Sequence, residues 1–134
     1  MRPFVIKSSQ GGRELRLEER KGEYFRVTLS GDAVSATKVV YVYTDGPRLA
    51  SFFASIAADW RGWEGERAWS ALEGDFSVRA TSDRLGHIRL DVELRRHDPD
   101  DNWRISAPVF LDAGSLDTVA ADAETFFSDA CATA

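Results

Sequence analysis

Residues 48–60, RLASFFASIAADW, place apolar side chains at the period of an α-helix, so that one face of the helix is continuously hydrophobic. That face consists of Leu49, Phe52, Phe53, Ile56, Ala57 and Trp60. Thr44 or Asp45 can cap the first turn, and Gly62 is a natural stop. We therefore predict an amphipathic helix that buries this face, with Trp60 in the core.

A second helix is expected over residues 116–130, LDTVAADAETFFSDA, with Ser115 as its N-cap. Leu116 follows Leu49 by 67 positions, and the apolar positions of the segments upstream match at the same offset. Two explanations stay open. One is an internal pseudo-repeat of a βββα unit, and the other is convergence of two unrelated segments on a similar layout.

The other segments alternate apolar and polar residues, which is typical of strands with one buried face. Strands are predicted over residues 4–7, 13–20, 24–30, 33–43, 75–81, 87–96 and 102–111. In the strand 13–20 the alternation places Arg20 on the charged outer face, and Lys21-Gly22 makes the hairpin that follows. Pro108 cannot donate to a sheet ladder, so the last strand is expected at a sheet edge or at a bulge.

Strands of this kind need a cover on the apolar face, and two amphipathic helices supply it. We predict an α+β fold, a two-layer sandwich in which a mostly antiparallel sheet of six or seven strands carries both helices on one face. The expected order is β-βββ-α-βββ-α. With 134 residues, of which 43% are hydrophobic, the chain has the size and composition of a single domain, 1–134.

The charge balance restricts the classes of partner. The net charge is −5, which argues against nucleic acid and anionic membranes and favours a basic protein partner. No apolar run approaches the roughly 18 residues that span a bilayer, and the first residues lack the pattern of a secretory leader. The expected location is therefore the cytoplasm, and the expected state is a monomer or a weak homodimer.

The residues needed for common catalytic chemistry are not found together in the sequence. Neither His87 nor His97 is near a nucleophile motif, and Cys131 stands alone close to the C-terminus. The acidic turn at residues 97–101, HDPDD, lacks the spacing of a calcium loop, although binding of a cation there stays open. We therefore expect no enzyme, no cofactor and no metal site.

The segment WRGWEGERAW, residues 60–69, holds three of the four tryptophans. It either pins a long connection to the core or forms a contact patch, because tryptophans flanked by charges occur at interface hot spots. Whether Trp63 and Trp69 are core or surface residues stays open. The candidate partner-binding residues are Trp63, Glu64, Glu66 and Trp69, followed by Asp98, Asp100 and Asp101.

Residues 49–95 resemble an actinobacterial family of small domains of unknown function. Its marks are a W-x-G-W helix end, a Trp-Ser-x-Leu-Glu-Gly stretch and a Gly-His-Ile strand. Here they are Trp60, Gly62 and Trp63; Trp69, Ser70, Leu72, Glu73 and Gly74; and Gly86, His87 and Ile88. More distantly, the layout is similar to that of WapI-type immunity proteins, which neutralise bacterial toxins. The second resemblance implies a partner protein and provides no catalytic residues.

The function predicted from these observations is that of a non-enzymatic binding protein, and the WapI-like layout points to an immunity protein that blocks a basic toxin domain by direct contact. Two alternatives stay open. One is a small-ligand-binding or enzymatic domain with a pocket between helices and sheet near Trp60 and Trp69. The other is a structural module that self-associates through the edge strand 102–111.

Overall fold

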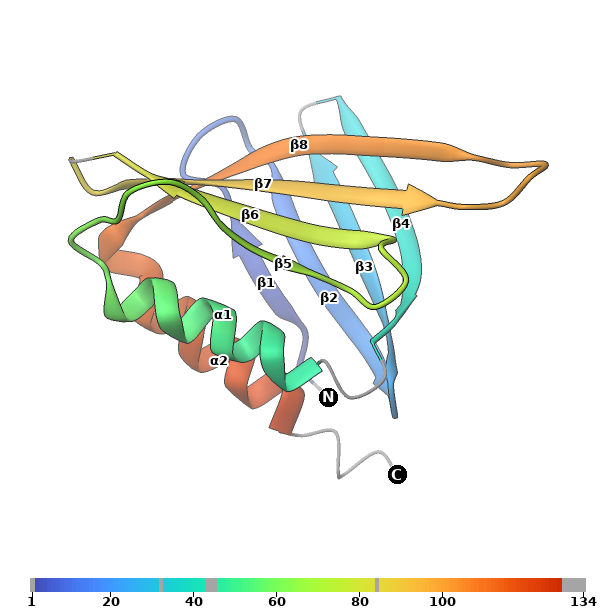
Figure 1. Ribbon diagram of the computed structural model, residues 1–134, viewed down its shortest axis with the longest axis horizontal. Helices are drawn as coiled ribbons and strands as arrows, with labels where there is room; N and C mark the ends of the chain where they lie inside the picture. Colours follow the sequence, from blue (N-terminus) through green and yellow to red (C-terminus); the bar gives the residue numbers. More distant parts are fainter. Residues whose placement is uncertain (1, 32, 43–45, 84, 129–134) are drawn as a thin grey trace.

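The computed structural model describes residues 2–31, 33–42, 46–83 and 85–128, and its described part is an α+β fold, as predicted (Figure 1). The strands are β1 (Phe4–Lys7), β2 (Glu14–Lys21), β3 (Tyr24–Gly31), β4 (Val34–Tyr41), β5 (Arg67–Ser70), β6 (Phe76–Ser82), β7 (His87–Arg96) and β8 (Trp103–Asp112). The helices are α1 (Gly46–Ala58) and α2 (Leu116–Ser128), with a 3-10 turn, η1 (Ala113–Ser115), before α2. Thr44, Asp45 and Cys131, which were discussed as caps and as a lone thiol, lie outside the described residues.

The prediction of one six- or seven-stranded sheet is wrong, because the described strands form two antiparallel four-stranded sheets. The first sheet has the order β1-β2-β3-β4, and the second has the order β5-β6-β7-β8. The missed strand is β5, which lies in the tryptophan segment and pairs Trp69 with Val78 of β6. The observed order is thus ββββ-α-ββββ-α, in which each half is a four-stranded meander followed by a helix.

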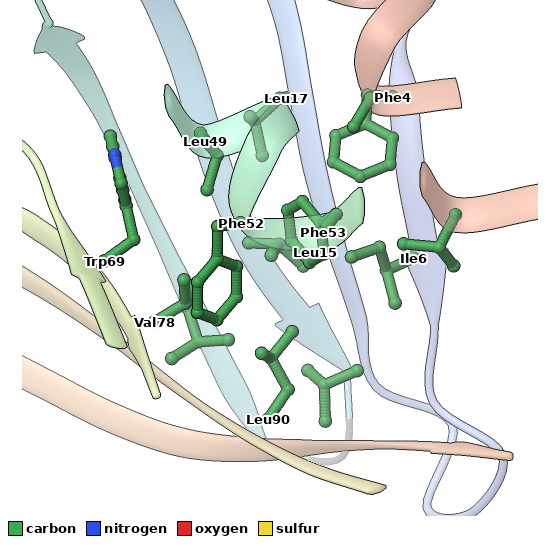
Figure 2. Close-up of a cluster of buried hydrophobic side chains, with 14 of the residues drawn as sticks. Phe4, Ile6, Leu15, Leu17, Leu49, Phe52, Phe53, Trp69, Val78 and Leu90 are labelled. Carbon is green, nitrogen blue, oxygen red and sulfur yellow. The ribbon is translucent and has the colours of Figure 1, made fainter. Parts of the chain in front are cut away.

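The two sheets and the two helices enclose one core. Figure 1 shows the strands of the two sheets crossing one another, with α1 and α2 side by side, and contacts link α1 to β5 and α2 to β1. In Figure 2, Phe52 and Phe53 of α1 belong to one buried cluster with Leu15 of the first sheet and Val78 and Leu90 of the second. The helices therefore fill the space that the crossing sheets leave open, which differs from the predicted position on one face of a single sheet.

Phe25 of β3 is at the centre of this core and is fully buried. Its ring makes edge-to-face contacts with Phe76 of β6 at 6.2 Å, and with Phe126 and Phe127 of α2 at 6.1 and 5.7 Å between ring centroids. Such contacts contribute about 0.5–1.5 kcal/mol each beyond the area that they bury. One side chain of the first half thus joins the sheet and the helix of the second half.

The helices confirm the predicted stripes in part. Leu49, Phe53 and Ile56 of α1 are buried, and so are Leu116 and Ala123 at the matching positions of α2, whereas Ala120 is half-buried. Ser115 does not cap α2 as predicted, because it belongs to the 3-10 turn and its hydroxyl donates to the carbonyl of Asp112 at 2.8 Å. None of the helices in the described part is long and apolar enough to span a membrane.

Arg20 corrects the predicted outer face of β2. The alternation of β2 slips at Glu19, which has a φ of 53°, and the pairing with β3 is irregular between Glu18 and Lys21. The slip turns Arg20 inward, where 8% of it is exposed. Its Nη1 donates to the carbonyl oxygens of Phe126, at 3.2 Å, and Phe127, and its guanidinium lies over the Phe127 ring. A cation thereby satisfies the last carbonyls of α2, at the negative end of the helix dipole.

We expect Arg20→Met to lower the free energy of unfolding by about 2–3 kcal/mol, because two buried carbonyls lose their donor. Arg16→Met on the same strand is the matched control, since Arg16 pairs with Glu14 and Glu18 at the surface. It should cost less than about 1 kcal/mol. Urea unfolding of both variants checks this, and equal losses would contradict the role given to Arg20.

Candidate functional site

Trp69 is a core residue. It lies on β5 with 9% of its surface exposed, and its ring meets Phe76 edge to face at 5.5 Å. In Figure 2 the Trp69 side chain lies beside the part of α1 that carries Leu49 and Phe52, and α1 contacts β5. The side chain therefore closes one edge of the core, and a partner can reach little of it.

Trp63 is half-buried and attached to the second sheet. Its Nε1 donates to the carbonyl of Ala80 at 3.3 Å, and the Arg67 guanidinium lies 5.2 Å from its ring centroid. Arg67 also donates to the carbonyl of Ser55 and pairs with Asp59, so it links β5 to the end of α1. These contacts match the interpretation in which aromatic side chains pin a long connection to the core.

Trp60 corrects a prediction, because it is 52% exposed rather than buried. Helix α1 ends at Ala58, and a turn closed by the bond from the Gly62 amide to the Asp59 carbonyl follows. The helical period therefore stops before it reaches Trp60, which stacks instead against Arg61, with 5.0 Å from the guanidinium to the ring centroid.

Glu64 and Glu66 are exposed in the same connection. A shallow pocket of about 370 Å³ lies beside them, lined by Trp63, Glu64 and the neighbouring Ser82 and Asp83. This end of the molecule presents two exposed acidic side chains next to a half-buried tryptophan.

Asp83, which lines that pocket, forms a pair with His87 that no motif in the sequence indicates. The Asp83 carboxylate accepts from the amides of Leu85 at 2.7 Å and His87 at 3.0 Å, and from His87 Nδ1 at 2.8 Å. The bond from the His87 amide is the main cause that holds the pKa of Asp83 below its ordinary value. Both side chains are exposed at a hairpin loop, and the pair serves to close that loop.

In the acidic turn at residues 97–101, Asp98 and Asp101 have hydrogen-bond or ion-pair partners in the turn and on Arg96. Asp98 accepts from the amide of Asp100 at 3.0 Å, and this bond is the main cause that lowers the pKa of Asp98. Arg96 pairs with Asp98 at 3.5 Å and with Asp101 at 3.4 Å. Asp100 is exposed. In the described ranges, no three His, Cys, Asp or Glu side chains are arranged to hold a metal ion.

The structure does not bring the two sets of predicted contact residues together. In Figure 1 the turn between β7 and β8, which carries Asp98, Asp100 and Asp101, is at one tip of the molecule. The connection from α1 to β5, which carries Trp63, Glu64 and Glu66, is at the opposite end. The two sets are therefore separate candidate surfaces.

A polar pocket that sequence reasoning missed lies beside the acidic turn. It has a volume of about 270 Å³ and is lined by Lys38 of β4, Glu73 and Asp75 of the β5–β6 turn, and His97. Asp75 is 4% exposed and pairs with Lys38 Nζ at 3.0 Å through Oδ2. We call this the Asp75 pocket. No local pattern predicts it, because Lys38 and Asp75 are 37 positions apart and meet only when the two sheets cross.

The second oxygen of Asp75 has no donor among the described residues. Oδ1 is fully buried and accepts no hydrogen bond, whereas Oδ2 binds Lys38. A buried acceptor without a donor costs about 1–3 kcal/mol. The Asp75 pocket and the acidic turn together form what we call the acidic end. Its carboxylates, which outnumber the basic groups Lys38 and Arg96, are those of Glu73, Asp75, Asp98, Asp100 and Asp101. Such a surface attracts cations and basic protein surfaces.

We expect Trp69→Phe to lower the free energy of unfolding by about 1–3 kcal/mol, because it opens a gap against Phe76. Trp60→Phe is the control and should change stability by less than about 0.5 kcal/mol. It should also remove a large share of the fluorescence that acrylamide quenches, because Trp60 is the exposed ring. A stable Trp69→Phe variant with strongly reduced quenching would contradict this assignment.

Asp83→Asn should lower stability near neutral pH and make less difference in acid. Because the folded-state pKa of Asp83 is lowered, its carboxylate stabilises the fold above the unfolded pKa of about 3.9. That contribution is lost as the pH falls through the folded-state pKa. Urea unfolding of both proteins at about pH 6 and about pH 3 measures the effect. A difference of the same size at both pH values would show that the charge of Asp83 is unimportant.

A solved structure resembles the chain loosely. A chain from the crystal structures of Trypanosoma bruciei MRP1/MRP2 is 12% identical with a TM-score of 0.49, and the match covers 96% of this chain and 83% of that chain. A likeness this weak supports no conclusion about function. No protein of curated function matches the sequence.

The match to a protein family is more extensive. The sequence model of DUF6228, a family of unknown function, covers residues 6–130. This match confirms the predicted resemblance to a family of unknown function, and it extends over nearly the whole chain. The protein belongs to the DUF6228 family.

Proposed function

We propose that this chain is a non-enzymatic cytoplasmic binding protein that recognises a basic partner protein through its acidic end. The observation that carries the proposal is that two turns at the same end of the second sheet both carry carboxylates (Figure 1). Glu73 and Asp75 come from the β5–β6 turn, and Asp100 and Asp101 come from the β7–β8 turn. Glu73, Asp100 and Asp101 are exposed, and Asp101 also pairs with Arg96.

Charge supports the choice of a basic partner. The net charge is −5, so the whole molecule attracts a positive protein surface, and the acidic end directs the approach. Long-range attraction of this kind raises the association rate and falls as salt is added. Binding of the partner should therefore weaken strongly with ionic strength.

The partner that we favour is a toxin domain, which would make the chain an immunity protein. The WapI-like layout of the sequence motivates this choice. Neutralisation by direct contact requires complementary surfaces and no catalytic group, and an acidic tip can cover a basic site on the toxin.

The two alternatives have less support from the geometry. Core side chains fill the space between α1 and the sheets, where a ligand pocket near Trp69 would have to lie (Figure 2). For self-association, β8 is an edge strand, as Pro108 predicted. The segment before β2 covers part of that edge, because Arg13 donates to the Pro108 carbonyl and Ser8 and Ser9 bond to Phe110. An edge covered in this way pairs less readily with a second copy.

Two matched double variants test which end binds the partner. Asp100→Asn/Asp101→Asn and Glu64→Gln/Glu66→Gln each remove two exposed carboxylates, from the acidic end and from the tryptophan segment respectively. With the chain as bait in extracts of its own cells, we expect the unaltered chain to retain one basic protein in a salt-sensitive manner. The Asp100→Asn/Asp101→Asn bait should retain it at least about tenfold less well, because charged contacts contribute about 1.5–3 kcal/mol each.

The Glu64→Gln/Glu66→Gln bait should retain the same protein as well as the unaltered chain does. Loss of the partner with this variant alone would move the binding site to the tryptophan segment. Retention of no basic protein by the unaltered chain would contradict the proposed function. For the toxin hypothesis, co-expression with the retained protein should restore growth, and the acidic-end variant should fail to do so.

A further inference from the structure

The Asp75 carboxylate has an unusual environment for a group at the edge of a core. The side chain is 6% exposed, and its Oδ2 accepts from Lys38 Nζ at 3.0 Å. Its Oδ1 is covered and accepts from none of the described residues. The backbone is held as well, because the Arg95 amide donates to the Asp75 carbonyl at 2.9 Å. A fixed carboxylate thus keeps one acceptor position unused.

The pocket that Asp75 lines favours a positively charged ligand group. Its charged lining consists of the carboxylates of Glu73 and Asp75 and the ammonium group of Lys38. The Lys38 ammonium is engaged by Asp75 and by the Val39 carbonyl at 3.3 Å, so it offsets only one of the two carboxylates. In the adjoining acidic turn Arg96 pairs with Asp98 and Asp101, and Asp100 is exposed, so the three aspartates outnumber this one arginine. An anion would meet net repulsion here, whereas a cation would meet attraction.

The size of the pocket fits the end of a long side chain. Its volume of about 270 Å³ equals the share of roughly nine liquid water molecules. That is enough for an alkylammonium or guanidinium group with part of its stem. Glu73 is exposed and stands at the rim, where its side chain can turn toward such a group.

We propose that the Asp75 pocket receives a lysine or arginine side chain of the basic partner, whose N–H groups donate to Asp75 Oδ1 and to Glu73. This inference rests on the proposed function, because it names the contact that anchors the partner at the acidic end. The acidic turn attracts the partner over distance, and the Asp75 pocket provides the short-range bonds. A small adjustment of the rim is required, because Oδ1 is covered in the absence of the partner.

Model cations test the pocket without the partner. We would titrate the isotope-labelled chain with N-acetyl-lysine amide, N-acetyl-arginine amide and neutral N-acetyl-glutamine amide, and follow the backbone amide signals by NMR. Both cations should shift the signals of Asp75, Arg95 and His97 in a saturable manner at millimolar concentrations, and the neutral compound should not. Saturable shifts at these residues would support the pocket as a cation site.

Substitutions then separate the pocket from its surroundings. Asp75→Asn should weaken cation binding at least about tenfold, since a bond to a charged group is lost. Because that variant can also disturb Lys38, Glu73→Gln at the exposed rim is the second variant, and it should weaken binding about threefold or more. Glu64→Gln at the opposite end is the control and should leave binding unchanged.

The outcomes distinguish this inference from the proposed function. If the cations shift no signal in a saturable manner, or if they shift only Asp100 and Asp101, the pocket is not a cation site. The double variants can still show that the acidic end binds a partner in that case. Conversely, saturable cation binding that Asp75→Asn and Glu73→Gln both weaken supports the pocket even if no partner protein is retained.

Discussion

The fold depends on one shared core that neither half can complete alone. Phe25 of the first sheet packs edge to face on Phe76 of the second sheet and on Phe126 and Phe127 of α2. Contacts between α1 and β5, and between α2 and β1, place each helix against a strand of the other half. Arg20 adds a polar link from β2 to the last carbonyls of α2. The two ββββα halves are thus interlocked rather than joined end to end.

The same interlocking creates the candidate site. Lys38 lies on the last strand of the first sheet, and Asp75 lies in the first turn of the second sheet, so their ion pair forms only where the sheets cross. Burying a charged pair costs desolvation, and Asp75 Oδ1 keeps that cost partly uncompensated within the described structure. This cost, next to exposed carboxylates, is why we propose the Asp75 pocket as a recognition element. The tryptophan segment, by contrast, uses Trp63 and Trp69 to hold a connection and a short strand in place.

Sequence reasoning succeeded where the signal is local and periodic. The stripes of both helices, the long strands and the edge position of Pro108 follow from spacing and from proline chemistry. It failed where tertiary contacts decide the outcome. Strand β5 has only four residues and no clear alternation, and without it the division into two sheets cannot be seen. The slip at Glu19 reverses the direction of Arg20, and the early end of α1 exposes Trp60. The composition of the acidic turn is enough to indicate a candidate contact surface. No such signal indicates Asp75, because its partner Lys38 is distant in sequence.

Under the proposed function, the acidic end is the recognition surface and the tryptophan segment is structural. Hydrogen–deuterium exchange of the backbone amides, with and without the protein that the chain retains, tests this claim most directly. The account predicts slower exchange on binding in residues 71–75 and 95–102, with no change in residues 60–66. Slower exchange in residues 60–66, with none at the acidic end, would contradict the account and would assign recognition to the tryptophan segment.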